Sequence, residues 1–279
     1  MDNPLAPERH RTLGLRRPGL RAGRWLGMGR MWARGLVDLA LPPVCMACRA
    51  AVGEPGCLCA PCWSRMRFIE RPYCDRLGIP LTHEYRTFGP AGPVVSEAAF
   101  AHPPAYGRAR AVATFGDVSR DMIHALKYAD RLDIAAPMAR MMARAGEDIL
   151  ADAGALVPVP LHPLRLWKRR FNQSMLLARG VAGVSGVPVR AGWLRRARAT
   201  TPQVGLDRSA RAQNVAGAFT VPEAMRAEVR GRRLVLVDDV LTTGATIDAC
   251  AKALMRAGAQ RVDVLVFARV VDGRDTPIS

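Results

Sequence analysis

One stretch, Arg233–Thr246 with the sequence RLVLVDDVLTTGAT, limits most strongly what this chain can fold into. Leu234–Val237 is an unbroken apolar run with valines and without helical spacing, which favours a buried strand of a parallel sheet. Two aspartates follow at once, and a small, hydroxyl-rich loop then leads into a helical pattern that ends near Gly258. The stretch therefore predicts the order strand, acidic pair, loop and helix.

The loop and the acidic pair indicate two parts of one ligand. Ligands of open α/β sheets bind at the carboxyl ends of the strands. There the free N–H groups of the helix and the hydroxyls of Thr242–Thr246 would form an anion cradle, and Gly244 would let a phosphate come close. Asp238 and Asp239 would repel that phosphate, so they indicate a polyol or a magnesium ion beside it. A phosphorylated sugar satisfies both halves.

Two other interpretations of this stretch compete with a sugar-phosphate site. A Walker B strand of an ATPase also ends in acidic residues, but such a site requires GxxxxGK[ST] upstream, and the chain contains no Gly-Lys dipeptide. A strand that ends in solvated acids and a turn, without any ligand, is the structural alternative. The agreement of strand, loop and helix around the acidic pair favours a ligand site.

The segment VLVDDVLTTGAT resembles the motif with which type I phosphoribosyltransferases bind phosphoribosyl pyrophosphate (PRPP). The rest of the chain resembles the ComF family, bacterial competence-related proteins with a zinc ribbon ahead of such a domain. The resemblance implies that Asp238 and Asp239 hold the 2- and 3-hydroxyls of the ribose, that Mg²⁺ accompanies PRPP, and that the acceptor is not specified. It also implies that the 5-phosphate is held by Thr242, Thr243, Gly244, Ala245 and Thr246.

Six of the seven cysteines lie between positions 45 and 74. The pairs Cys45-x-x-Cys48 and Cys59-x-x-Cys62 have the ligand spacing of a zinc ribbon, because each pair directs two thiolates at one tetrahedral ion. Disulfides are the alternative, which a cytosolic chain without a secretion signal disfavours. We therefore expect these four cysteines to bind a structural zinc ion, which would supply most of the stability of so short a segment.

A second pair of the ComF type is incomplete in this chain. The matching stretch is Cys74–Gly78, in which leucine stands where the second cysteine is expected. Cys57, Cys74 and His83 are the residues left that could share a second ion, although a lone histidine beside a ribbon is more often an ordinary surface residue.

Two basic segments are candidates for the pyrophosphate of PRPP. After the predicted first core strand, Ala155–Pro160, the chain runs LHPLRLWKRRFNQ, and by resemblance this loop holds the pyrophosphate. The later pattern TPQxxLxxxxRxxN resembles a ComF signature at the position of the mobile loop that closes over PRPP, which would exclude water and supply charge to the leaving group. A basic surface hairpin is the alternative. The candidate residues are Lys168, Arg169 and Arg170 in the first segment, and Arg208 and Arg211 in the second.

The remaining elements complete an α/β domain. Ala111–Phe115 and Val262–Val270 are predicted strands, and Ser119 is a predicted N-cap. A second helix is expected over residues 134–150. Lys127 could reach a phosphate or could equally be a surface lysine. We expect a type I phosphoribosyltransferase-like parallel sheet flanked by helices, preceded by a small zinc ribbon.

At 279 residues the chain has room for one α/β domain and a small module. We expect a basic tail and short amphipathic helix over residues 1–40, the ribbon over 41–80, a linker over 81–107 and the main domain over 108–273. With 41 Lys and Arg against 24 Asp and Glu, the net charge is +17, which favours polyanionic partners. An arginine-rich genome explains the same excess equally well.

The expected location is the cytoplasm. No run reaches the roughly 18 uninterrupted apolar residues that a transmembrane helix needs, so stable membrane insertion is not expected. Arg30 and Arg34 interrupt the early apolar region that a signal peptide would use.

Three functions follow from these patterns. The first is transfer of a phosphoribosyl group from PRPP to an unidentified base. The second, implied by the ComF resemblance, is a non-catalytic protein that binds PRPP and single-stranded DNA and acts with the competence machinery in DNA uptake; the low aromatic content, 6%, offers few rings to stack bases. The third is a regulatory PRPP sensor. The sequence leaves the oligomeric state open, a homo-oligomer included.

Overall fold

The structure, a computed structural model, describes residues 42–81, 85–87, 92–128, 131–161, 171–197 and 217–271. The chain divides into two compact units at the boundary between Pro42 and Pro43, and apart from Pro42 every described residue belongs to the second unit. The basic tail and amphipathic helix expected over residues 1–40 lie outside the described residues.

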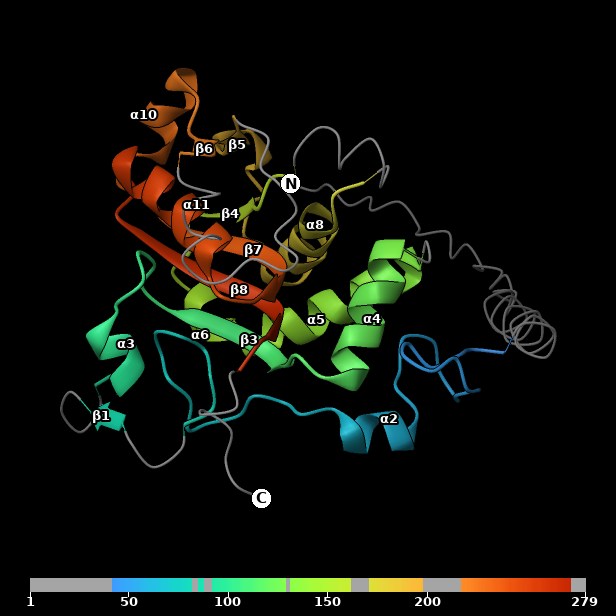
Figure 1. Ribbon diagram of the computed structural model, residues 1–279. Helices are drawn as coiled ribbons and strands as arrows, with labels where there is room; N and C mark the ends of the chain where they lie inside the picture. The colour runs from blue at the N-terminus through green and yellow to red at the C-terminus, as the bar shows by residue number, and fades with distance from the viewer. Residues whose placement is uncertain are drawn as a thin grey trace, which may run out of the picture. The chain divides into compact units, whose positions relative to one another are not determined.

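A four-stranded parallel sheet forms the centre of the second unit (Figure 1). Its strand order is β3-β8-β7-β4, with strands at Ala109–Thr114 (β3), Arg261–Arg269 (β8), Arg233–Leu241 (β7) and Ala155–Pro158 (β4). The two central strands are buried along almost their whole length, as expected for apolar runs covered on both faces. The predicted α/β class, a parallel sheet flanked by helices, is confirmed.

Helices cover both faces of this sheet, and alternate residues of β7 and β8 pack against them (Figure 1). On one face, Val235 and Val237 belong to the core with α4 (Asp117–Tyr128), α5 (Ala135–Ala145) and α8 (Gln173–Ser185). On the other face, Leu234 and Leu236 pack with α11 (Ala245–Arg256) and Phe219. β7 is therefore held between the helices of the two faces.

Two helix boundaries differ from the sequence prediction. Helix α4 begins at Asp117, so the prediction of Ser119 as N-cap is wrong; the Ser119 hydroxyl accepts from the Gly116 N–H (2.9 Å) and donates to the Thr114 carbonyl (2.9 Å). The helix predicted over residues 134–150 is divided at Gly146 into α5 and α6 (Glu147–Leu150). A Cβ at Gly146 would lie 2.7 Å from Leu265 Cδ1, so glycine allows the helical turn to approach β8.

Smaller elements surround the sheet. The ribbon segment contains α2 (Ala60–Arg65), and the expected linker contains β1 (Tyr85–Thr87), β2 (Val94–Ser96) and α3 (Glu97–Ala101). The remaining short elements are η1 (Leu132–Ile134), η2 (Ala191–Trp193), β5 (Arg195–Arg196), β6 (Phe219–Thr220), η3 (Glu223–Met225) and α10 (Arg226–Val229). Among the described residues, no helix combines the length and the apolar character needed to cross a membrane.

The cysteine-rich segment packs directly on the main domain. Phe68 bridges to Ala113 of β3, and the Ile69 N–H donates to the Val112 carbonyl at 3.0 Å. Cys45 and Cys62 are buried in the same cluster as residues of β3, α4 and α5. Because the two parts share a core, whatever orders the ribbon also stabilises one face of the sheet.

Candidate functional site

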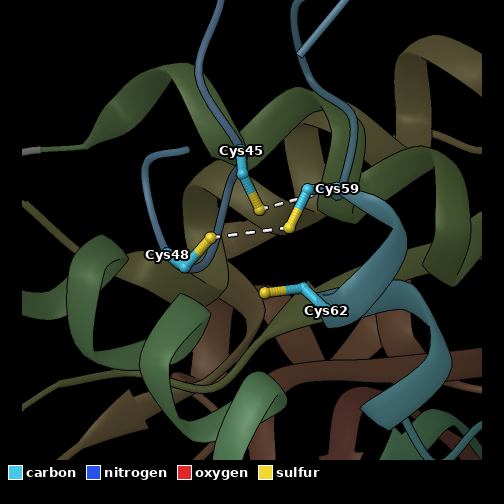
Figure 2. Close-up of side chains that lie close together, drawn as sticks. All are labelled: Cys45, Cys48, Cys59 and Cys62. Atoms are coloured by element: carbon cyan, nitrogen blue, oxygen red, sulfur yellow. Dashed lines mark hydrogen bonds between the residues drawn. The ribbon is translucent and has the colours of Figure 1, made fainter. Parts of the chain in front are cut away.

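Four cysteines converge at the beginning of the described chain. The sulfur atoms of Cys45, Cys48, Cys59 and Cys62 all lie within 4.8 Å of one another, and Figure 2 shows the four side chains pointing toward a common centre. A tetrahedral zinc ion with Zn–S bonds of about 2.3 Å would place its sulfur ligands about 3.8 Å apart. The predicted ligand set therefore fits one zinc ion, and the ribbon is confirmed.

Local contacts shift the pKa values of two of these thiols in opposite directions. Cys59 is the N-cap of α2, and its N–H donates to Cys45 Sγ at 3.3 Å. Burial opposes ionisation of Cys45, but hydrogen bonds from N–H groups, that of Cys59 foremost, outweigh it and lower the pKa of this thiol to about 6. Burial raises the pKa of the Cys62 thiol to about 12. A bound zinc ion favours the thiolate at both positions.

A second site lies where β7 ends, among α4, α8 and α11. Asp238 Oδ1 accepts from the Ser174 hydroxyl at 2.8 Å and from the Asp239 N–H at 2.9 Å. Asp239 Oδ2 forms an ion pair with Lys127 Nζ. Ser174 stands in the first turn of α8, whose N-cap is Asn172, and Lys127 stands in the last turn of α4. The two carboxylates are thus held by side chains from two different helices.

Burial and the neighbouring charge of Asp239 raise the pKa of Asp238 to about 7, although the Ser174 hydrogen bond and the Lys127 charge act in the opposite direction. Near neutral pH the acidic pair is therefore poised between one and two negative charges. A group that is tuned in this way at the end of a buried strand is a candidate for ligand binding.

Beyond the acidic pair, the loop to α11 has the geometry of an anion site. Gly244 is the N-cap residue of α11 with φ of +86°, a conformation that strains other L residues, and it has no side chain that could accept from the first-turn N–H groups. The N–H groups of the first turn therefore point toward the loop Thr242–Gly244, where an anion would be favoured. Arg269, at the end of β8, donates to the carbonyls of Leu241 (2.9 Å) and Thr242 and so fixes this loop.

The structure brings some of the predicted site residues together and leaves others outside its described part. Asp238, Asp239 and the loop Thr242–Thr246 lie at one end of β7. The sequence analysis missed Ser174 and Arg269 altogether. Asn172, which the sequence associated with the pyrophosphate loop, instead caps α8 and donates to the Val159 carbonyl at 3.1 Å. The predicted basic site residues all lie outside the described ranges; they are Lys168, Arg169, Arg170, Arg208 and Arg211.

Comparisons with known proteins match both parts of the chain to known domain families. Residues 36–92 match the double zinc ribbon domain family, and residues 184–278 match the phosphoribosyl transferase domain family. The DNA utilization protein YhgH of Escherichia coli is 32% identical over 240 residues, covering 84% of this chain and 100% of that protein. The chain belongs to the ComF/YhgH family.

Two further proteins resemble this ComF/YhgH chain over different lengths. Competence protein F of Haemophilus influenzae is 27% identical over 232 residues, covering 81% of this chain and 96% of that protein. An adenine phosphoribosyltransferase of Nocardia farcinica is 37% identical over 94 residues, covering 34% of this chain and 47% of that enzyme. The family assignment thus rests on most of the chain, and the likeness to an enzyme rests on the transferase domain.

In the described part of the second half of the double ribbon, this ComF/YhgH protein shows no converging set of metal ligands. Cys74 is buried, and its sulfur accepts from the Leu77 N–H (3.4 Å) and from the N–H and hydroxyl of Ser96 (both 3.3 Å). In the described ranges no second group of three or more potential ligands converges, and Cys57 is exposed. His83 lies outside the described residues. Hydrogen-bond donors therefore surround the Cys74 sulfur from its own turn and from the adjoining strand β2.

Proposed function

We propose that the site at the end of β7 binds PRPP. One observation carries the proposal: adjacent aspartates lie near the carboxyl end of a central parallel strand that ends at Leu241, and the loop Thr242–Gly244 then leads to a helix N-terminus whose N-cap is a glycine at positive φ. This order supplies acceptors for a sugar diol beside donors for a phosphate. Family membership and the transferase domain match support the same ligand.

The roles within this site follow from charge. Asp238 and Asp239 accept the 2- and 3-hydroxyls of the ribose, and Thr242–Thr246 surround the 5-phosphate. The basic residues Lys168, Arg169 and Arg170 hold the pyrophosphate, and Arg208 and Arg211 close over it. Asp239 Oδ2 already pairs with Lys127, which does not fit direct ligation of Mg²⁺ by that oxygen. Magnesium would instead arrive with the phosphates of PRPP.

If the protein catalyses phosphoribosyl transfer, the reaction is a displacement at C1 of the ribose. A nitrogen atom of the acceptor forms a bond to C1, the bond between C1 and the pyrophosphate oxygen breaks, and the acceptor releases a proton. The protein needs no side-chain nucleophile, because it contributes orientation and stabilises the charge on the leaving group. The acceptor would be an unidentified base.

DNA is the second candidate ligand, and the names of two relatives favour it. They are a DNA utilization protein and a competence protein, each matched along nearly its whole length. On this alternative, the chain binds PRPP without turnover and contacts single-stranded DNA during uptake in the cytoplasm. The net charge of +17 supports contacts to phosphates.

Calorimetric titration of zinc-loaded protein with PRPP and magnesium tests the first candidate. We expect micromolar binding, and Asp238→Asn with Asp239→Asn should weaken it about 100-fold or more, because amides replace two charged acceptors of the diol. Asp117→Asn with Asp121→Asn is the matched control, since these aspartates are exposed on α4. The control protein should bind PRPP with the wild-type affinity. Absence of binding to folded wild-type protein, or equal binding by both double variants, would contradict the proposed site.

Single-stranded DNA binding should survive the same acidic-pair substitution. The acidic pair would repel a phosphate backbone, so its loss should leave DNA affinity unchanged or slightly increased. Fluorescence anisotropy with a labelled oligonucleotide at two salt concentrations measures this. Equal loss of PRPP and DNA affinity would show that both ligands use one surface.

A further inference from the structure

Lys127 connects helix α4 to the acidic pair through a mostly buried ion pair. Its Nζ atom contacts Asp239 Oδ2, and the Lys127 and Asp239 side chains are 20% and 9% exposed. Among the described residues, this is the one ion pair that either carboxylate makes. A lysine that merely covers the surface would keep its ammonium in water.

Two adjacent carboxylates need such a cation. In a partly buried site, like charges on neighbouring residues cause one proton to be shared between them. A protonated carboxyl group donates a hydrogen bond and loses acceptor capacity, so it is a poorer partner for a sugar hydroxyl. Without a compensating charge, the pair would keep its shared proton to a higher pH than it does with Lys127 in place.

Other elements around the pair do not supply this charge. Ser174 of α8 offers a neutral hydroxyl to Asp238. From α11, Cys250 is buried, and burial followed by the charge of Asp238 raises the pKa of its thiol well above the usual value. Arg196 of β5 acts in the opposite direction on that thiol. Of the described groups, Lys127 alone forms an ion pair with the two acids.

We propose that Lys127 is a positioning residue whose ammonium holds the Asp239 carboxylate toward the ligand and offsets the repulsion between the two acids, so that Asp238 can release its proton near neutral pH and both acids accept the vicinal hydroxyls of a sugar phosphate. This inference rests on the proposed function of the site and specifies the class of ligand group that the acidic pair takes. It assigns the pair to a neutral diol, because a divalent ion on Asp239 Oδ2 would repel the lysine already there.

The test compares Lys127→Met and Lys127→Arg with wild type across pH 6–9, measuring PRPP affinity by calorimetry. At pH 7 we expect the methionine variant to bind about tenfold more weakly or worse, and to recover as rising pH removes the shared proton. The arginine variant retains the charge and should stay within about threefold of wild type. Lys252→Met, which removes an exposed lysine from α11, is the matched control.

Two results would overturn the proposal: an unchanged pH profile in Lys127→Met, or a loss of affinity that is equal at every pH, as a simple phosphate contact would give. Carboxyl carbon NMR of the ligand-free protein decides the question without PRPP. We expect the acidic pair to titrate at higher pH in the methionine variant than in wild type, and identical titrations would sink the inference. If wild type bound no PRPP while the titrations differed, the proposed ligand would fail and the role of Lys127 would stand.

Discussion

Replacing Cys45 and Cys48 with serine should remove the bound zinc and unfold the protein well beyond the ribbon. The reason is that Cys45 is completely buried and packs in the same core cluster as residues of β3, α4 and α5. Structural zinc contributes about 10–16 kcal/mol in zinc-finger peptides, whereas a whole domain is stable by about 5–15 kcal/mol. Loss of the ion therefore threatens the shared core.

Metal analysis and thermal unfolding together measure this effect. Wild-type protein should contain one equivalent of zinc, and the double variant none. The melting temperature should fall by about 10 °C or more, since each kcal/mol shifts it by about 2–4 °C in a domain of this size. Cys57→Ser is the matched control, because that exposed thiol stands outside the sulfur cluster and should change neither quantity.

Other outcomes would revise specific parts of the structure. Two zinc equivalents in wild-type protein would contradict the single site and indicate that His83 or Cys57 completes another. Full retention of the melting temperature after zinc loss would show that the buried contacts of the ribbon with β3 hold it without the metal. Both the zinc content and the melting temperature can be measured on the purified full-length protein.

The strongest sequence predictions came from local patterns. The apolar run before Asp238 predicts a buried parallel strand because it lacks helical spacing; β7 contains that run but continues through the acidic pair to Leu241, so the predicted end of the strand is wrong. The CxxC pairs predict a zinc site because their spacing is itself the ligand geometry, and the four sulfur atoms converge as expected. Where the physical constraint acts over a few residues, the sequence alone is sufficient.

Contacts between distant segments could not be predicted in the same way. Lys127 offered two equal interpretations, a phosphate ligand and a surface lysine, whereas it pairs with Asp239. The hydrogen bond from Ser174 to Asp238 joins residues 64 positions apart. No local pattern specifies these partners, because they meet only once α4, α8 and β7 have packed together. The sequence therefore located the site, and the fold supplies the groups that tune its charge.

Arg110 makes another contact between distant segments that the sequence could not predict. Its removal is expected to cause the second large loss of stability. Its guanidinium is 3% exposed and pairs with Asp75 Oδ1 at 2.7 Å and with Asp148 Oδ2 at 2.6 Å. It also donates to the carbonyls of Asp75 (3.1 Å) and Ala109 (2.9 Å). Arg110→Met would remove this cation from Asp75 and leave Asp148 with the more distant Arg108, whose Nη1 lies 3.6 Å from Oδ2, and should destabilise the protein by about 3–5 kcal/mol.

Thermal or denaturant unfolding checks this value. The matched control is Arg120→Met, which removes an arginine that pairs with exposed aspartates on α4 and should cost less than about 1 kcal/mol. Equal, small effects of both substitutions would contradict the structural role of Arg110. Loss of zinc from the Arg110→Met protein would instead show that the cluster around Cys45 depends on this contact.

The pH dependence of stability gives an independent signature of the same contact. Burial opposes ionisation of Asp148, but the hydrogen bond and charge of Arg110 outweigh it and lower the pKa of that carboxyl. An aspartate in the unfolded chain has its ordinary pKa of about 4, so below that pH the unfolded chain binds more protons than the folded protein. The stability of the wild-type protein should therefore fall as pH falls from about 4 toward the lowered pKa of Asp148. Asp133 and Asp152, whose pKa values other arginines lower, keep their part of this decline, so Arg110→Met should make the decline shallower without removing it. An unchanged acid limb would contradict the assignment.

Arg110 has this large effect because of where Asp75 lies. Asp75 follows Cys74 in the half-ribbon that lacks a complete ligand set, and its carboxylate also accepts from the Val94 N–H at 2.9 Å. The segment from Cys74 to Ser96 is thus tied to β3 by an ion pair and to itself by hydrogen bonds to one sulfur. We expect the first half of the ribbon to depend on zinc and the second half to depend on Arg110, so the two substitutions should destabilise the protein independently.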